Sequence, residues 1–201
     1  MKTMSEIAEE VGADKRPEEH DYCGTYERVV GHLRNKPCKI LEVGVKRGAG
    51  MKMWLEAFPI AQIVGVDKNT SKCEARSERL TLLDGDATKA GTYQVAARYG
   101  LFDLVSEDSA HSYEASMACL NALPILVKPG GVMVIEDVQL GYSHPENKSM
   151  ERFVNEAAKL AHGGGTLKTY PGRHWHMATP LAKEIASVEM CRGLVIVRRV
   201  G

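Results

Sequence analysis

The sequence predicts an α/β fold built on a doubly wound, mostly parallel sheet of seven strands. Short apolar runs alternate with segments of helical periodicity along most of the chain, which is typical of parallel strands joined by crossover helices. Most of these runs stop at glycine, proline or acidic residues, as buried strands do. Two β-rich runs flank Cys191-Arg192-Gly193 and predict a terminal hairpin, which adds an antiparallel strand at one edge.

The N-terminal third should contain helices before the sheet begins. A short helix is expected over 3–11, because Gly12 follows it, and a second over 22–33, because its apolar residues share one face. We interpret residues 1–36 as an N-terminal helical extension and residues 37–201 as the domain proper. The first expected strand, 39–43, leads through a glycine-rich turn into a helix that directs Met51 and Trp54 inward.

The remaining elements follow from the same alternation of patterns. The further strands are expected at 62–66, 81–83, 101–105, 132–135, 184–190 and 194–199. Helices are expected at 71–79, 92–99, 112–126 and about 149–161. Residues 163–181 show no readable period and are expected to be irregular.

Composition excludes several classes of protein. The chain has 26 basic and 26 acidic residues among 201, so it has no net charge with which to attract nucleic acid or a membrane surface. The polar N-terminus predicts neither a signal peptide nor a membrane span. Five scattered cysteines without a CxxC pair argue against a disulfide framework or a zinc site, and they fit a cytoplasmic protein. Homo-oligomer formation stays open.

Two apolar runs end in adjacent acids. Glu107-Asp108 follows the run that begins at Phe102, Glu136-Asp137 follows the run at 132–135, and His111 comes three residues after Asp108. If the two strands are neighbours, three or four carboxylates and an imidazole converge at the carboxyl edge of the sheet. A hard divalent cation fits such oxygen ligands and offsets their mutual repulsion. One acidic pair alone would be a solvated strand end, whereas two matching pairs favour a site.

The glycine turn predicts a nucleoside site. It contains Gly44, Gly48 and Gly50 and is preceded by Glu42, and the spacing is GxxxGxG where a pyrophosphate-binding turn has GxGxxG. Asp67 ends the second strand, where a carboxylate can accept both hydroxyl protons of a ribose. Asp86, after the third strand, is expected to flank an adenine. This spacing argues against a nicotinamide-dependent dehydrogenase and resembles the first motif of class I S-adenosylmethionine (SAM) methyltransferases.

Longer segments carry a more specific resemblance. The segments LEVGV, IVGVDK, FDLVSEDSAH and LVKPGGVMVIEDV, together with Asp14-Lys15, His20-Asp21-Tyr22 and Tyr26 before them, resemble the magnesium-dependent sugar O-methyltransferases of the macrocin and mycinamicin type, relatives of rhamnosyl O-methyltransferases. The chain departs from that pattern at Glu107 and Ser109, where the family has aspartate and glycine.

The resemblance implies a Rossmann-like fold, SAM and Mg²⁺ as cofactors, and a small hydroxylated acceptor in natural product biosynthesis. It implies that Asp108, Glu136 and Asp137 bind the metal and that His111 is the general base. The residues implied to line the SAM site are Glu42, Gly44, Gly48, Gly50, Asp67, Asp86 and Asp108.

Two other functions remain alternatives. A catechol-type O-methyltransferase also chelates a diol through Mg²⁺, but its fifth strand ends in an acid-Asn pair, whereas this chain has Glu136-Asp137. A non-catalytic SAM-binding protein would keep the fold without the ligands. The sequence leaves open the roles of His20, Tyr22, His174 and His176.

Overall fold

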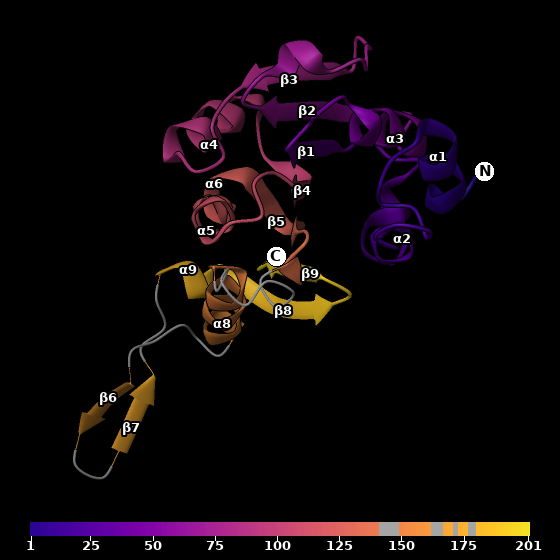
Figure 1. Ribbon diagram of the computed structural model, residues 1–201. Coiled ribbons are helices and arrows are strands. Elements are labelled where there is room, and N and C mark those ends of the chain that lie inside the picture. The colour runs from indigo at the N-terminus through magenta and orange to yellow at the C-terminus, as the bar shows by residue number, and fades with distance from the viewer. Residues whose placement is uncertain (141–148, 162–166, 171–172, 177–179) are drawn as a thin grey trace.

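The computed structural model describes residues 1–140, 149–161, 167–170, 173–176 and 180–201. Its main sheet has seven strands in the order β3-β2-β1-β4-β5-β9-β8 (Figure 1). The strands of this sheet are β1 (Lys39–Val43), β2 (Gln62–Asp67), β3 (Leu80–Asp84), β4 (Phe102–Glu107), β5 (Val127–Ile135), β8 (Ile185–Cys191) and β9 (Leu194–Arg199). The first five pair in parallel, and β9 pairs antiparallel with β5 and β8. The predicted fold class is confirmed.

Helices cover both faces of this sheet (Figure 1). The α-helices described are α1 (Met4–Val11), α2 (Cys23–Val30), α3 (Ala49–Ala57), α4 (Ala90–Ala96), α5 (Tyr113–Asn121), α6 (Leu123–Leu126), α8 (Ser149–Ala161) and α9 (Pro180–Lys183). Short 3-10 helices occupy Gly31–Leu33, Thr70–Lys72 and Ala97–Tyr99. No helix in these ranges is both long and apolar enough to span a membrane.

The N-terminal helices belong to the core of one face. Met4 and Ile7 of α1 and Tyr26 of α2 are buried in the same cluster as Trp54 of α3. The helix α1 ends at Gly12, as the sequence predicted; Gly12 is in the left-handed conformation, and Thr3 caps the other end with a capping box. Residues 1–36 therefore pack directly beside the first crossover helix. Their separation from 37–201 as an extension stays a prediction.

Three expected elements were wrong. Residues 73–79 are not helical: burial of Cys73 and Ala75 against Gly48 and hydrogen bonds from Arg79 to the carbonyls at Leu55, Phe58 and Ala61 hold this segment in a non-helical path.

The helix expected over 112–126 is divided at Ala122, because Pro124 lacks an N–H and starts a second short helix. Within 163–181, expected to be irregular, β6 (Leu167–Tyr170) and β7 (Arg173–His176) form a two-stranded antiparallel sheet. The side chains of His174 and His176 lie outside the described part of the structure.

Strand register brings the acidic strand ends together. Val43 of β1 pairs with Glu107 of β4, and Glu107 pairs with Ile135 of β5. The next backbone bonds run from Asp108 N to Val43 O at 2.8 Å and from Glu136 N to Glu107 O at 2.9 Å. Asp108 and Glu136 therefore lie side by side at the carboxyl edge, as predicted.

Gly44 permits this convergence at the end of β1. Its φ is +101°, and a Cβ there would lie 1.9 Å from the carbonyl oxygen of Asp108. The glycine thus serves the close approach of β1 and β4, in addition to any contact with a ligand.

We expect Gly44→Ala to destabilise the protein by at least about 3 kcal/mol, because it combines a backbone clash with a left-handed φ. Urea denaturation measures the change. Gly24→Ala is the matched control, since Gly24 lies in α2 with open space around its Cβ position, and it should be neutral or stabilising by up to about 1 kcal/mol. Equal stability of the two variants would contradict the steric account.

Candidate functional site

A buried cluster of opposite charges lies at the carboxyl ends of β4 and β5. The Lys15 ammonium donates to Asp108 Oδ2 at 2.7 Å and to Glu136 Oε2 at 3.0 Å. All three side chains are less than 10% exposed. Burial alone would lower the pKa of Lys15, but Glu136 and Asp108 together raise it well above its usual value. Lys15 is therefore a permanent cation within the cluster.

Glu136 faces the interior. Its Oε1 accepts from the hydroxyls of Tyr26 at 2.5 Å and Ser106 at 2.7 Å, while its Oε2 faces Lys15. Both oxygens thus have protein partners. Burial raises the pKa of Glu136, and the charge of Lys15 opposes this rise.

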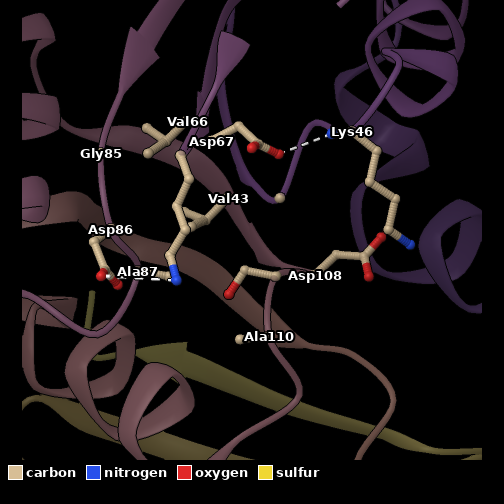
Figure 2. A pocket seen from close by; sticks show the side chains of 12 residues that line it. Val43, Lys46, Val66, Asp67, Gly85, Asp86, Ala87, Asp108 and Ala110 are labelled. Carbon is tan, nitrogen blue, oxygen red and sulfur yellow. Dashed lines mark hydrogen bonds and ion pairs between the residues drawn. The ribbon is translucent and has the colours of Figure 1, made fainter. Parts of the chain in front are cut away.

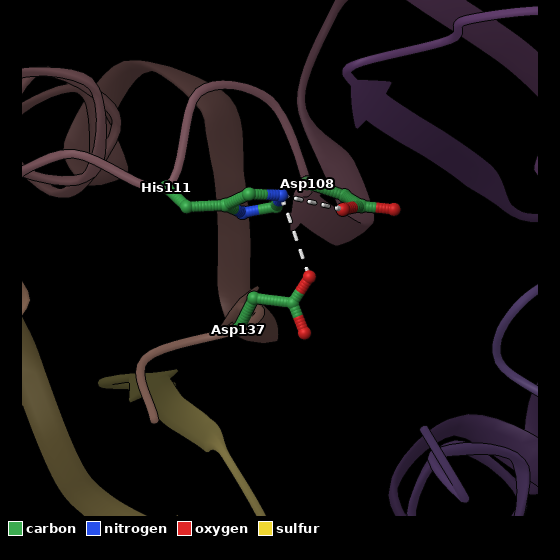
Figure 3. Close-up of side chains that lie close together, drawn as sticks. All are labelled: Asp108, His111 and Asp137. Carbon is green, nitrogen blue, oxygen red and sulfur yellow. Dashed lines mark ion pairs between the residues drawn. The ribbon is translucent and has the colours of Figure 1, made fainter. Parts of the chain in front are cut away.

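Two further residues, His111 and Asp137, face Asp108 beside this cluster (Figure 3). His111 Nε2 lies 3.4 Å from Asp137 Oδ2 and 4.0 Å from Asp108 Oδ1. One donor atom from each of these residues lies within 4.8 Å of the other two. We call Asp108, His111 and Asp137 the cation group.

The surroundings of Asp137 keep its carboxylate ionised. Oδ1 accepts from the Tyr22 hydroxyl at 2.7 Å and from Gln139 Nε2 at 3.2 Å, and His20 Nδ1 lies 3.6 Å away. Burial raises the pKa of Asp137, but the Tyr22 hydrogen bond and the His111 and His20 imidazoles outweigh it, so the pKa is lowered overall. Oδ2, which faces His111, is then a negatively charged donor for a cation.

Backbone conformation marks the same residues. His111 has φ of +46° and Asp137 has φ of +58°, in a region that side chains other than glycine adopt at a cost. Strained residues of this kind cluster at functional sites, where the surrounding structure keeps a side chain in the position its function needs despite the cost in stability.

The donor set fits a hard divalent cation. Cation–oxygen bonds are about 2.0–2.6 Å long, so one ion can bridge atoms spaced as in the cation group. Among the described residues, His111 Nδ1 is buried and has no hydrogen-bond partner. The other ring nitrogen, Nε2, faces Asp108 and Asp137. The predicted convergence of acids and imidazole is therefore present.

The predicted acids do not all join the cation group. Glu107 is fully buried, and its oxygens accept from Ser109 and Ser116 on the side of α5. Its pKa is raised by burial. Glu136 also lies outside the group of three, and its assignment as a metal ligand stays a prediction.

An open cavity of about 480 Å³ lies over the ends of β1, β2 and β4 (Figure 2). Four predicted cofactor residues line it: Gly44, Asp67, Asp86 and Asp108. The cavity is also lined by Lys46, Lys68 and Ala110.

Asp67 also organises the glycine turn. Its Oδ2 accepts from the backbone N–H groups of Val45 and Lys46, each at 2.9 Å, and its Oδ1 accepts from Asn69 N at 3.1 Å. A carboxylate has about four lone-pair positions. Asp67 can therefore hold the turn and still accept from a ligand hydroxyl.

The other predicted cofactor residues have different surroundings. Glu42 and Gly50 line a second cavity of about 550 Å³, which shares Gly44 and Asp108 with the first. Trp54 Nε1 donates to Glu42, and burial raises the Glu42 pKa to about 7. Gly48 lines neither cavity.

Gly48 packs instead against residues 73 and 75. A Cβ on Gly48 would lie 2.5 Å from Cys73 Sγ, and its φ is +90°. This packing and the positive φ already require a glycine at position 48, whether or not a ligand binds there. A direct cofactor role for Gly48 therefore stays a prediction.

The sequence pattern gave no role to Lys15 or Tyr26 and left the role of Tyr22 open. Both tyrosine rings are buried, and their hydroxyls donate to the strand-end acids. Hydrophobic periodicity predicts which face of a helix is buried. It does not predict which group a tyrosine hydroxyl on that face binds. The strand-end acids were expected to converge with no basic side chain or hydroxyl assigned to them. That imbalance was the signal that could have pointed to Lys15, Tyr22 and Tyr26.

Comparison with known proteins supports the resemblance found in the sequence. No family model matches the chain. Demethylmacrocin O-methyltransferase of Streptomyces fradiae is 34% identical over 131 residues, which are 61% of this chain and 33% of that protein. The 8-demethyl-8-(2-methoxy-alpha-L-rhamnosyl)-tetracenomycin-C 3'-O-methyltransferase of Streptomyces olivaceus is 31% identical over 147 residues, 69% of this chain and 37% of that protein. The chain thus spans about a third of the length of these relatives.

Solved structures share the fold. The MycE methyltransferase of the mycinamycin pathway, solved in complex with Mg and SAH, has a TM-score of 0.83 at 23% identity over 99% of this chain and 55% of its own. The O-methyltransferase TomG of Streptomyces achromogenes, solved with SAM, has a TM-score of 0.58 at 19% identity over 100% of this chain and 91% of its own. The Rossmann-like methyltransferase fold is confirmed.

We expect Tyr26→Phe to lower the free energy of unfolding by about 1–3 kcal/mol, because it leaves buried Glu136 without one of its donors. Tyr99→Phe, at a ring that is 41% exposed, is the control and should change stability little. Urea denaturation at neutral pH compares the two. A Tyr26→Phe protein as stable as wild type would mean that the hydrogen bond to Glu136 contributes nothing.

Proposed function

We propose that the protein is a SAM-dependent and divalent-cation-dependent O-methyltransferase that acts on a hydroxyl of a sugar or another hydroxylated natural product. The observation that carries this proposal is the position of Asp108, which belongs to the cation group and also lines the cavity. A cation and a cofactor bound there would lie next to each other. That proximity is what transfer of a methyl group to a cation-activated hydroxyl requires.

The relatives support the same chemistry. Those described above are named as O-methyltransferases of demethylmacrocin and of a rhamnosyl-tetracenomycin, and MycE was solved with Mg and SAH. We extend SAM, Mg²⁺ and a small-molecule acceptor to this chain on the strength of its own acids and glycine turn. We also propose a cytoplasmic location, which the five unpaired cysteines support.

The two cavities suggest how SAM would lie. The adenosine would occupy the first cavity, with a ribose hydroxyl donating to Asp67 and the adenine beside Asp86. The methionine part would extend past Gly44 toward the second cavity, which Glu42 and Gly50 line. The sulfonium would then lie near Asp108, where the cavities meet.

The reaction is an in-line displacement. The acceptor oxygen forms a bond to the methyl carbon, the bond from carbon to sulfur breaks, and its electron pair stays on the sulfur of the departing thioether. The hydroxyl proton must leave, because a neutral alcohol, which loses its proton only far above physiological pH, is a poor nucleophile. A divalent cation would supply Lewis acidity at the acceptor oxygen.

We assign His111 as the general base that takes the hydroxyl proton of the acceptor. Asp108 and Asp137 would bind the cation directly, and Glu136 is the further predicted ligand. Mg²⁺ prefers carboxylate oxygens to imidazole nitrogen, so the aspartates are its natural partners. His111 Nε2 lies 3.4 Å from Asp137 Oδ2, so the imidazole would be next to an acceptor hydroxyl bound to a cation at Asp137. Asp137 would stabilise the imidazolium that forms.

Cation binding separates this proposal from a SAM-binding protein without catalysis. In calorimetric titrations with SAM present, we expect Mg²⁺ to bind wild type and to bind Asp137→Asn at least about tenfold more weakly, since a charged ligand is lost. SAM affinity should be unchanged. Asp84→Asn is the matched control, because Asp84 ends β3 outside both cavities.

Absence of any SAM binding by wild type would remove the proposal. SAM binding with equal Mg²⁺ affinity in all three proteins would leave a SAM-binding fold and remove this cation site. Acceptors to screen are sugars with vicinal hydroxyls and, for comparison, catechols.

His111→Gln distinguishes a base from a ligand. If His111 takes the proton, kcat should fall by about 10²–10⁴-fold while Mg²⁺ and SAM affinities stay at the wild-type value. Single-turnover methyl transfer measures the rate, and calorimetry measures the affinities. A loss of Mg²⁺ affinity parallel to the loss of rate would instead make His111 a ligand.

A further inference from the structure

Glu107 is a buried carboxylate that takes no part in the proposed chemistry. It is 0% exposed at the end of β4, and Ser106, its neighbour in the strand, points to the opposite face of the sheet, where it binds Glu136. Successive side chains of a strand alternate between the two faces. The backbone therefore directs Glu107 to the face covered by α5, and this direction does not depend on a bound ion.

The Glu107 carboxylate joins the strand, the turn that follows it and the next helix. Its Oε1 accepts from the backbone N–H of Ser109 at 3.2 Å and from the Ser109 hydroxyl. Its Oε2 accepts from the hydroxyl of Ser116, in α5, at 3.1 Å. We call Glu107, Ser109 and Ser116 the turn brace.

The turn at 108–111 carries two kinds of functional group. Asp108 and His111 belong to the cation group, while Ser109 and Ala110 line the first cavity. Asp108 N is bound to a carbonyl of β1 at one end of the turn, and α5 begins after the other end, where His111 has an unfavourable positive φ. Between these two ends, Ser109 is bound to Glu107.

We propose that Glu107 is a positioning residue for methyl transfer: through Ser109 it holds residues 108–111 in one conformation and so fixes where Asp108 and His111 lie at the site. This inference rests on the proposed function for the chemistry of Asp108 and His111. The chain differs from the sugar O-methyltransferase pattern at both Glu107 and Ser109, so the contact between these two side chains is a feature of this chain.

The turn brace requires the length of the Glu107 side chain and not its charge. The donors that bind it are a backbone N–H and two hydroxyls, which are all neutral. A glutamine of the same length can accept from Ser109 through its amide oxygen and donate to Ser116 through its amide nitrogen, since a hydroxyl also accepts. An aspartate keeps the charge but is one methylene shorter, so it cannot reach both serines.

The test compares Glu107→Asp with Glu107→Gln, and Glu78→Asp is the control because Glu78 is exposed and lies outside both cavities. In single-turnover methyl transfer at saturating SAM and Mg²⁺, the rate constant of Glu107→Asp should fall at least about tenfold, because small displacements of reacting groups are costly. Glu107→Gln keeps the contacts, so its rate should stay within about threefold of wild type. Glu78→Asp should match wild type.

Amide hydrogen exchange tests the turn without any assay of activity. In the protein without ligands, the Ser109 amide should exchange at least about tenfold faster in Glu107→Asp than in wild type or Glu107→Gln. Exchange in β2 should be equal in all of these proteins, which excludes general unfolding.

A double variant tests whether the two residues act through one contact. In a Ser109→Ala background the hydroxyl that Glu107 binds is already gone. Glu107→Asp should then lower the transfer rate by a factor at least about threefold smaller than it does in wild type.

Three results would overturn the inference. Loss of rate in Glu107→Gln with a normal rate in Glu107→Asp would mean that charge matters. Faster exchange with an unchanged rate in Glu107→Asp would mean that Glu107 contributes only to packing, and unchanged exchange would mean that it does not hold the turn. If wild type transfers no methyl group to any acceptor, the proposed function fails, and the exchange rates alone then decide whether Glu107 holds the turn.

Discussion

The buried contact of Lys15 with Asp108 and Glu136 is the interaction on which the geometry of the site depends. Two carboxylates at neighbouring strand ends cannot stay ionised in a dry interior unless a positive charge lies between them. The ammonium supplies that charge at 2.7 and 3.0 Å and fixes the direction of each carboxylate. Since Lys15 comes from the N-terminal segment, the helices α1 and α2 are required for the site as well as for the core.

The sheet determines which oxygens remain for a ligand. Parallel pairing of β1, β4 and β5 places the strand ends at one edge, and Gly44 allows β1 to approach the carbonyl of Asp108. Tyr22 and Tyr26 then bind Asp137 and Glu136 from α2 and the turn before it. What stays open is Asp108 Oδ1 and Asp137 Oδ2, next to His111 and to a cavity shaped by the glycine turn.

Sequence patterns predicted the sheet and the position of the acids because strand burial and strand ends are local properties. The five parallel strands, the terminal hairpin and the meeting of Asp108 with Asp137 follow from apolar runs and their terminating residues. The direction of each carboxylate was not predictable, since Glu136 and Asp137 are adjacent and differ only in the partners that fold against them. The path of residues 73–79 depended likewise on Arg79 reaching three carbonyls of a different element. Both features depend on contacts between distant parts of the chain, about which local periodicity carries no information.

The central claim is that a divalent cation and SAM lie next to each other across Asp108. The most direct measurement is the NMR signal of the SAM methyl group in the complex with the paramagnetic ion Mn²⁺, in wild type and in Asp108→Asn. The account predicts strong broadening of the methyl signal in wild type that disappears when Mg²⁺ replaces Mn²⁺ and is lost in the variant. A sharp methyl signal from bound SAM at saturating Mn²⁺ would contradict it.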